Sequence, residues 1–274
     1  MHKKYNIGVF DSGYGGLTIL KEIEKLLPEY NYIYLGDNAR APYGNRSFET
    51  VYKYTLEAVK KLFELDCNIV LLACNTASAK ALRTIQQKDL ESIAPGRRVL
   101  GVIRPSTEAV DLYSKTKHVG ILGTIGTVKS ESYVIEIQKM YPHIIVEQEA
   151  CPMWVPLVEN DEYKTEGADY FIKKNITNLL SKDKSIDTVI LGCTHYPLLI
   201  EKIKEYTPAG ITIVNQGEIV AKSFSDYLIR HPELETQCIK NREQRFYTTD
   251  STELFDSIGS TFLGKVINSR KINL

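Results

Sequence analysis

Two cysteines in this sequence lie where a reactive thiol is expected. Cys74 ends the apolar run at residues 69–73 and precedes a predicted helix, a position that lowers the pKa of a thiol. Cys193 ends the similar run at residues 189–191. For either residue taken alone, a buried and unreactive cysteine is an equally good interpretation. Two cysteines at matching strand ends are much harder to explain in that way.

The pair suggests proton transfer at both faces of one ligand. If the two strand ends face each other across a cleft, one thiolate removes a proton from a carbon and the opposite thiol returns one to the other face, which inverts a stereocentre without a cofactor. His195 lies close enough to Cys193 in sequence to tune that thiol or relay a proton. The developing negative charge needs preorganised donors. Candidate donors are Ser12, Asn75, Thr76, Thr124 and Thr194, with nearby backbone amides.

Metal and nucleotide chemistry have weaker support. Cys193 and His195 are suitable metal ligands, but no CxxC or HExxH pattern completes a zinc site. The glycine-rich segment 11–16 is neither GxGxxG nor a P-loop, and its Asp11 or Ser12 can equally be a helix cap. We therefore expect no metal and no cofactor. The other three cysteines, Cys67, Cys151 and Cys238, are predicted to be non-catalytic.

The elements that position these residues alternate between short apolar runs and amphipathic helical patterns. Continuous apolar runs are typical of strands buried on both faces, and the alternation predicts an α/β fold with mainly parallel sheets. Ligands bind at the carboxyl ends of such strands, where the candidate residues fall. The runs occupy residues 7–10, 32–35, 69–73, 99–103, 119–122, 144–146, 189–191, 211–214 and 246–247.

A weak internal repeat predicts two similar halves. Residues 7–13 resemble residues 119–124, and residues 69–76 resemble residues 188–195. Proline and glycine breaks at 94–96 and 208–210 suggest boundaries. We predict two similar α/β domains that face each other across an active-site cleft. The first comprises residues 1–96 plus about 210–274, and the second residues 97–209.

The composition limits the classes of binding partner and the cell compartment that we expect for this protein. The 274 residues carry 34 Lys and Arg against 34 Asp and Glu, so neither nucleic acid nor a membrane surface has an electrostatic footprint. Five irregularly spaced cysteines suggest a reducing compartment. The N-terminal segment lacks a signal-peptide hydrophobic region, and the longest apolar runs are too short to span a bilayer. We expect a cytoplasmic protein with a small-molecule substrate.

Six motifs, in order, resemble those of the glutamate racemases, within the cofactor-independent Asp/Glu racemase family. The combination is highly specific, and the two cysteines with their flanking residues contribute most to it. The motifs are FDSGYGGL (10–17), GDNARAPYG (36–44), ACNTAS (73–78), GTIGT (123–127), CPMWVPLVE (151–159) and LGCTHYPLL (191–199).

The resemblance implies an active site between two α/β domains, without pyridoxal phosphate, metal or nucleotide. It implies that Cys74 acts on the D-isomer with help from Asp11, and that Cys193 acts on the L-isomer with help from His195. Glu159 matches a position near the pocket. The matched substrate-binding positions are Asp11, Ser12, Tyr43, Gly44, Asn75, Thr76, Thr194 and His195.

The resemblance also implies a role in supplying D-glutamate for bacterial peptidoglycan, and we expect a homodimer. Tyr14 and Trp154 depart from the family pattern and can alter the shape of the pocket. An aspartate racemase, or another two-cysteine amino-acid racemase, is the alternative within the same class. A Cys–His thiol hydrolase and a non-catalytic anion-binding module are alternatives from other classes.

Overall fold

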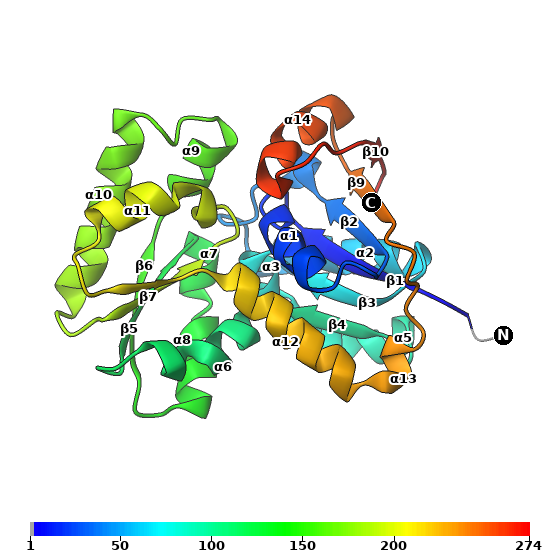
Figure 1. Ribbon diagram of the computed structural model, residues 1–274, viewed down its shortest axis with the longest axis horizontal. Coiled ribbons are helices and arrows are strands. Elements are labelled where there is room, and N and C mark those ends of the chain that lie inside the picture. Colours follow the sequence, from blue (N-terminus) through cyan, green and yellow to red (C-terminus); the bar gives the residue numbers. More distant parts are fainter. Residues whose placement is uncertain (1–2) are drawn as a thin grey trace.

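The computed structural model describes residues 3–274 and contains two sheets of parallel strands (Figure 1). The first sheet has the order β10-β9-β2-β1-β3-β4, and the second has the order β6-β5-β7-β8. The first sheet contains β1 (Asn6–Asp11), β2 (Tyr32–Gly36), β3 (Cys67–Leu72), β4 (Arg98–Gly101), β9 (Gln244–Thr248) and β10 (Ser269–Lys271). The second contains β5 (His118–Gly123), β6 (Ile145–Ala150), β7 (Thr188–Gly192) and β8 (Thr212–Val214).

The two sheets share one topology. The order β2-β1-β3-β4 in the first sheet matches β6-β5-β7-β8 in the second, with β9 and β10 added beyond β2. The strand before Cys74 is therefore equivalent to the strand before Cys193, as the internal repeat suggested. The predicted α/β fold with parallel sheets is confirmed, and each of the nine apolar runs overlaps a strand.

Helices cover the faces of both sheets, which explains the continuous apolar strands. All six residues of β1 and of β3 are buried. The apolar faces of two amphipathic helices are also buried. They include Leu17, Leu20 and Ile23 of α1 (Leu17–Leu26) and Val51 and Leu62 of α2 (Phe48–Glu64). The other helices of the first lobe are α3 (Asn75–Lys80), α4 (Leu82–Thr84), α5 (Leu90–Ile93), α13 (Pro232–Glu235) and α14 (Thr252–Leu263).

The second lobe has helices of 5 to 17 residues around its smaller sheet. They are α6 (Ile103–Tyr113), α7 (Ile125–Lys129), α8 (Ser132–Met140), α9 (Trp154–Glu159), α10 (Glu166–Lys182) and α11 (Ile200–Tyr206). The long helix α12 (Gln216–Arg230) returns the chain to the first lobe and packs against both α1 and α6 (Figure 1). It therefore contacts elements of both lobes.

Strand pairing indicates where the chain passes from one lobe to the other, and we call these two points the crossovers. β4, at residues 98–101, pairs with β3, so it belongs to the first sheet although we expected the second domain to begin at residue 97. β8 pairs with β7, so it belongs to the second sheet although we expected the first domain to resume at about 210. We therefore propose crossovers near residues 102 and 215.

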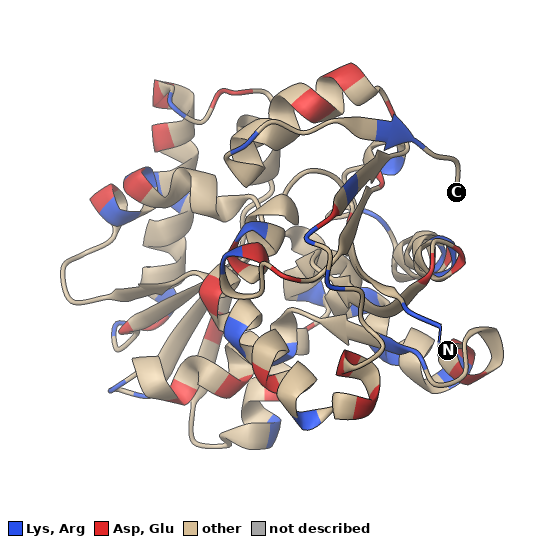
Figure 2. Cartoon of the chain, turned by 45° about the vertical axis from the view of Figure 1, so that its right-hand side comes forward, with Lys and Arg blue, Asp and Glu red and all other residues tan. Residues whose placement is uncertain are grey.

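Charged residues are spread over the outer helices, with acidic and basic residues interspersed along the ribbon (Figure 2). This distribution agrees with the equal numbers of acidic and basic residues in the sequence. Among the helices of residues 3–274, none has the length and apolar character needed to cross a bilayer.

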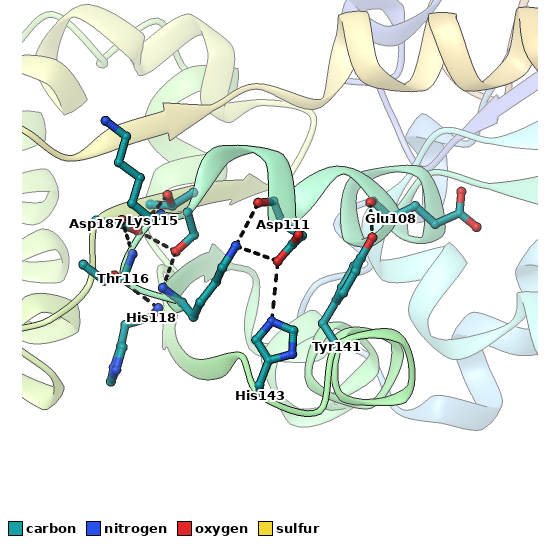
Figure 3. A network of polar contacts seen from close by, with 11 residues as sticks. Glu108, Asp111, Lys115, Thr116, His118, Tyr141, His143 and Asp187 are labelled. Atoms are coloured by element: carbon teal, nitrogen blue, oxygen red, sulfur yellow. Dashed lines mark hydrogen bonds and ion pairs between the residues drawn. The ribbon is translucent and has the colours of Figure 1, made fainter.

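A polar network holds the turn between α6 and β5 (Figure 3). Asp187, just before β7, accepts hydrogen bonds from the backbone amides of Lys115 and Thr116 at 2.7 and 2.8 Å and from Ser114 Oγ at 2.7 Å. Burial alone would raise the pKa of Asp187, but these hydrogen bonds outweigh it and lower the pKa to about 2. The ionised carboxylate thus fastens this turn to the start of the central strand β7.

We expect Asp187→Asn to lower the free energy of unfolding by about 1 kcal/mol at neutral pH, since partial exposure screens the lost charge. The pKa in the folded chain lies below the ordinary 3.8, so the stabilisation is complete above that pH and disappears as the pH falls toward about 2. Urea unfolding at several pH values measures this difference. The exposed Asp226→Asn is the control, and a difference that persists at pH 2 would contradict the account.

Candidate active site

A cavity lies between the two sheets, at the carboxyl ends of their strands. It has a volume of about 600 Å³, including the solvent at its mouth. Residues that follow β1, β3, β5, β6 and β7 all contribute to its wall, as expected for a ligand site in parallel α/β sheets. The cavity is therefore the candidate active site.

The cavity brings together nearly all the predicted site residues. Asp11 is the exception, because it is buried beneath the wall rather than part of it. The wall also includes residues that the sequence argument did not select. The predicted members are Ser12, Tyr43, Gly44, Cys74, Asn75, Thr76, Thr124, Glu159, Cys193, Thr194 and His195. The unselected members are Pro42, Asn45, Ile125, Cys151, Pro152, Val155 and Pro156.

Cys151 is the most notable of these additions, because it is a third thiol on the cavity wall. It follows β6 and is 1% exposed. Burial raises the pKa of Cys151 well above its ordinary value, and the carboxylate of Glu149 adds to this. Cys151 is therefore a neutral thiol in this cavity, and the prediction that it is non-catalytic stays a prediction.

Cys74 occupies the N-cap position of α3, where its Sγ accepts a hydrogen bond from the amide of Ala77 at 3.4 Å. Ser12 Oγ lies 3.5 Å from the same sulfur, so the loop after β1 also contacts it. Asp11, at the end of β1, accepts a hydrogen bond from the amide of Gly13 through one carboxylate oxygen. The other oxygen is buried and has no hydrogen-bond partner among the described residues.

The prediction that the helix N-terminus lowers the pKa of Cys74 is wrong. Burial raises the pKa to about 12, and the nearby Asp11 carboxylate adds to the effect, whereas Ser12 and the Ala77 amide only partly oppose it. The helix is six residues long, so its amides supply too little positive potential to offset desolvation. Cys74 is a protonated thiol in this structure.

Cys193 has a different partner. It follows β7, and its Sγ lies 3.9 Å from Nδ1 of His195. The other ring nitrogen, Nε2, lies 3.0 Å from the Glu159 carboxylate, which α9 brings across the cavity. The His195 ring also packs edge-on against Phe262 of α14 at 5.3 Å. These contacts fix both the position and the orientation of the imidazole.

His195 is a cation at neutral pH. Burial alone would lower the pKa of the imidazole, but the hydrogen bonds and charges of Cys193 and Glu159 outweigh burial and raise the pKa to about 10. A protonated imidazole beside Cys193 stabilises negative charge on that sulfur. Thus one thiol faces a carboxylate and the other faces a cation.

Hydroxyls and amides from both lobes meet at the far side of the cavity. Thr76 Oγ1, from the first lobe, lies 3.0 Å from Thr124 Oγ1, from the second. Nearby, the amide of Gly126 donates to the carbonyl of Gly44 at 2.8 Å, which joins the loop after β2 to the start of α7. A Cβ atom at Gly126 would approach that carbonyl to 2.9 Å, so glycine permits this close contact.

The Tyr43 side chain is held in place through its hydroxyl. Its hydroxyl donates to Asp37 at 2.5 Å, and Asp37 is also paired with Arg40 at 2.6 Å. Burial raises the pKa of Tyr43 far above its ordinary value, and Asp37 adds to the shift. The hydroxyl is thus a neutral donor used by Asp37, and Tyr43 contributes a rigid aromatic surface to the cavity wall.

Tyr14 and Trp154, the two residues that depart from the family pattern, lie behind the wall of the cavity. Tyr14 stacks on Phe255 and Phe262 of α14, with ring centroids 5.6 and 6.1 Å apart. Trp154 is completely buried and lies edge-on to Tyr196 at 4.7 Å. Tyr14 therefore supports the helix that packs on His195, a link that no sequence motif indicated.

Fold and site together define an α/β protein with two lobes of similar topology, in which equivalent strands lead to Cys74 and to Cys193 on the wall of a single cavity. The family model for the Asp/Glu/Hydantoin racemases matches residues 7–223. A glutamate racemase of Listeria monocytogenes serotype 4a (strain HCC23) is 40% identical over 261 residues, which cover 95% of this chain and 94% of the relative. The chain belongs to the Asp/Glu/Hydantoin racemase family, as its motifs predicted.

Solved structures of glutamate racemases are similar to this chain along their whole length. The glutamate racemase isoform RacE1 from Bacillus anthracis has a TM-score of 0.90 at 36% identity, covering 100% of this chain and 99% of that one. The glutamate racemase from Francisella tularensis subsp. tularensis SCHU S4, in complex with D-glutamate, has a TM-score of 0.87 at 32% identity, covering 98% of each chain. The likeness therefore extends over both lobes and the cavity between them.

The backbone at Gly15 lies very close to the side chains of two site residues. A Cβ atom there would lie 2.2 Å from Thr194 Oγ1 and 2.5 Å from His195 Nδ1. We expect Gly15→Ala to displace both side chains and to lower the free energy of unfolding by about 1–3 kcal/mol, measured with urea. Gly167→Ala is the control, because its nearest atom is 3.6 Å away. A Gly15→Ala variant as stable as the parent would refute this packing.

The charge of His195 depends on Glu159. Replacing that carboxylate with an amide in Glu159→Gln removes a negative charge, so the pKa of His195 should fall from about 10 toward neutrality. A titration of the ring by ¹⁵N NMR measures this change. Glu162→Gln, at an exposed neighbouring position, should leave the titration unchanged. If both variants titrate like the parent, Glu159 does not control the imidazole.

Proposed function

We propose that this chain is a glutamate racemase that interconverts L- and D-glutamate by proton transfer at Cα between two cysteine thiols. The observation that carries the proposal is the pairing of Cys74 and Cys193 at equivalent strand ends on the wall of one cavity, with opposite charges beside them. The relatives that match along the whole chain are glutamate racemases, which supports this choice of substrate.

We assign unequal roles to the two thiols. Protonated His195 beside Cys193 stabilises negative charge on that sulfur, so Cys193 is the proposed base toward L-glutamate, and Cys74, whose pKa is raised, is the proposed acid. With L-glutamate bound, Cys193 takes the α-proton while Cys74 donates its proton to the opposite face. The product is D-glutamate, and the thiol and thiolate have exchanged places. In the reverse direction Asp11, whose pKa is raised mainly by burial, assists Cys74.

The negative charge that develops next to the α-carboxylate needs hydrogen-bond donors already in place. We assign this work to the polar residues of the wall, since they come from both lobes and line the same cavity as the two sulfurs. They are Ser12, Asn75, Thr76, Thr124 and Thr194, and Tyr43 and Gly44 line the same cavity. The scheme uses protein side chains alone as acids and bases.

We further propose a cytoplasmic homodimer that supplies D-glutamate for peptidoglycan. A reduced thiol pair is what the chemistry requires, and all five cysteines are free in the structure. The aspartate racemase, thiol hydrolase and anion-binding alternatives differ from this proposal in substrate or in the use of one thiol or none, so they are separated by direct assays.

Optical rotation tests the choice of substrate. We expect L-glutamate, incubated with the protein without added cofactor, to lose rotation until the two isomers are equal, while L-aspartate keeps its rotation under the same conditions. Loss of rotation with aspartate alone would support the alternative within this class. A stable rotation with both amino acids would refute the proposed activity.

Both thiols should be essential. Cys74→Ser and Cys193→Ser each replace a thiol with a much weaker acid, so we expect racemisation to fall by about 100-fold or more in each. Cys238→Ser, at a buried cysteine outside the cavity, is the control and should keep most of the activity. A fully active Cys74→Ser or Cys193→Ser variant would exclude the two-thiol mechanism.

A further inference from the structure

Asn75 belongs to a buried chain of polar side chains that connects the two lobes. Asn75 begins α3 and lines the cavity, whereas Gln216 begins α12. Tyr133 of α8 and Ser106 of α6 complete the chain. All four side chains are at most 3% exposed, so their hydrogen bonds are made with one another rather than with bulk water. We call these four residues the amide chain.

The hydrogen bonds of the amide chain run in one direction. Ser106 Oγ donates its single hydrogen to the carbonyl of Val102 at 3.1 Å, so it must accept from Gln216 Nε2, which lies 2.7 Å away. This orientation turns Gln216 Oε1 toward Asn75, where it accepts a hydrogen bond from Nδ2 at 2.8 Å. A helix carbonyl near β4 therefore sets the orientation of an amide in the cavity wall.

Tyr133 is compatible with this direction but does not determine it. Its hydroxyl accepts from Gln216 Nε2 at 2.5 Å and donates to Asn75 Oδ1 at 2.7 Å. A hydroxyl can donate or accept, so it would also tolerate a flipped Asn75. Gln216 would not, because a flipped amide would place Oδ1 of Asn75 against Oε1 of Gln216, two buried acceptors without a hydrogen between them.

We propose that Gln216 is a positioning residue that makes Asn75 present an N–H to the cavity and so selects a carboxylate over a carboxamide on the substrate. The Nδ2 atom carries two hydrogens, and Gln216 accepts one of them, which leaves the second for the ligand. This inference rests on the proposed function, since glutamate carries two carboxylates. Its two monoamides, glutamine and isoglutamine, are the matched probes.

Gln216→Met tests the proposal, because it keeps the length of the side chain and removes both its acceptor and its donors. We expect KM for L-glutamate to rise about tenfold while kcat changes much less, since the thiols are untouched. The preference for glutamate over one of the two monoamides, measured by competitive inhibition, should fall by a similar factor. The monoamide that gains shows which carboxylate Asn75 contacts. Unchanged KM and unchanged selectivity would overturn the proposal.

Two further variants separate positioning from a loss of structure. Gln86→Met removes a comparable hydrogen bond, from Nε2 to the carbonyl of Val99 at 2.7 Å, outside the cavity, and should keep the parent KM. Ser106→Ala should act in the same direction as Gln216→Met, because it frees the glutamine to turn. The double variant should be no worse than Gln216→Met alone, since Ser106 acts through Gln216. Strictly additive losses would contradict this route.

A measurement without turnover distinguishes this inference from the proposed activity. In protein labelled with ¹⁵N-asparagine, the side-chain signals of Asn75, identified by their loss in Asn75→Asp, should be protected from hydrogen exchange and become unprotected in Gln216→Met. If the parent protein leaves glutamate unchanged, the proposed activity fails while this result still decides the inference. Asn75 signals that are the same in the parent and in Gln216→Met would overturn it.

Discussion

The two thiols of the proposed mechanism, Cys74 and Cys193, share a cavity whose wall, in the described residues, contains one basic side chain, His195. A buried negative charge needs a cation or several hydrogen bonds close by. Cys193 has that cation, whereas Cys74 has the carboxylate of Asp11 and the full cost of burial. The two sulfurs therefore lie in unequal environments, and in the proposed mechanism this inequality makes one of them the base and the other the acid.

Much of the surrounding structure serves the position of that imidazole. Gly15 leaves room for the ring, Glu159 holds Nε2, and Phe262 closes the remaining side. These contacts come from the first lobe, the second lobe and the C-terminal helix α14, respectively. The charge of the site thus depends on the two lobes being held together, and α12, which packs against helices of both, contributes to this.

The repeated topology explains why Cys74 and Cys193 lie on the wall of the same cavity. Equivalent strands of the two sheets end at the cavity, so residues that follow them are brought together although they are far apart in sequence. The lobes differ in what surrounds those strand ends. The first strand ends in Asp11 in one lobe and precedes Thr124 in the other, so a duplicated scaffold carries unequal chemistry.

The sequence predicted the parallel α/β fold well because strands covered on both faces are continuously apolar. It missed β10, whose Arg270 and Lys271 are exposed, since a polar edge strand lacks that signal. The boundaries that it suggested lie a few residues before the crossovers that we propose from strand pairing, because proline and glycine mark turns and not the partner of the next strand.

In the site, strand ends identified the two thiols, but the pKa of Cys74 depends on burial, which spacing does not report. The place of Cys151 on the cavity wall and the contact between Gln216 and Asn75 depend on the folded arrangement of separate elements. Cys151 begins one of the six family motifs, but its spacing does not place it on the cavity wall, and Gln216 lies in no motif, so sequence reasoning alone could not establish either position.

The placement of deuterium during early turnover tests the two-thiol account most directly. In deuterated water, each thiol exchanges with solvent on its own side of the substrate. Starting from L-glutamate, the account predicts that newly formed D-glutamate carries deuterium at Cα while the remaining L-glutamate does not. Equal early labelling of both isomers, or unlabelled D-glutamate, would mean that a single group carries the proton across and would contradict the account.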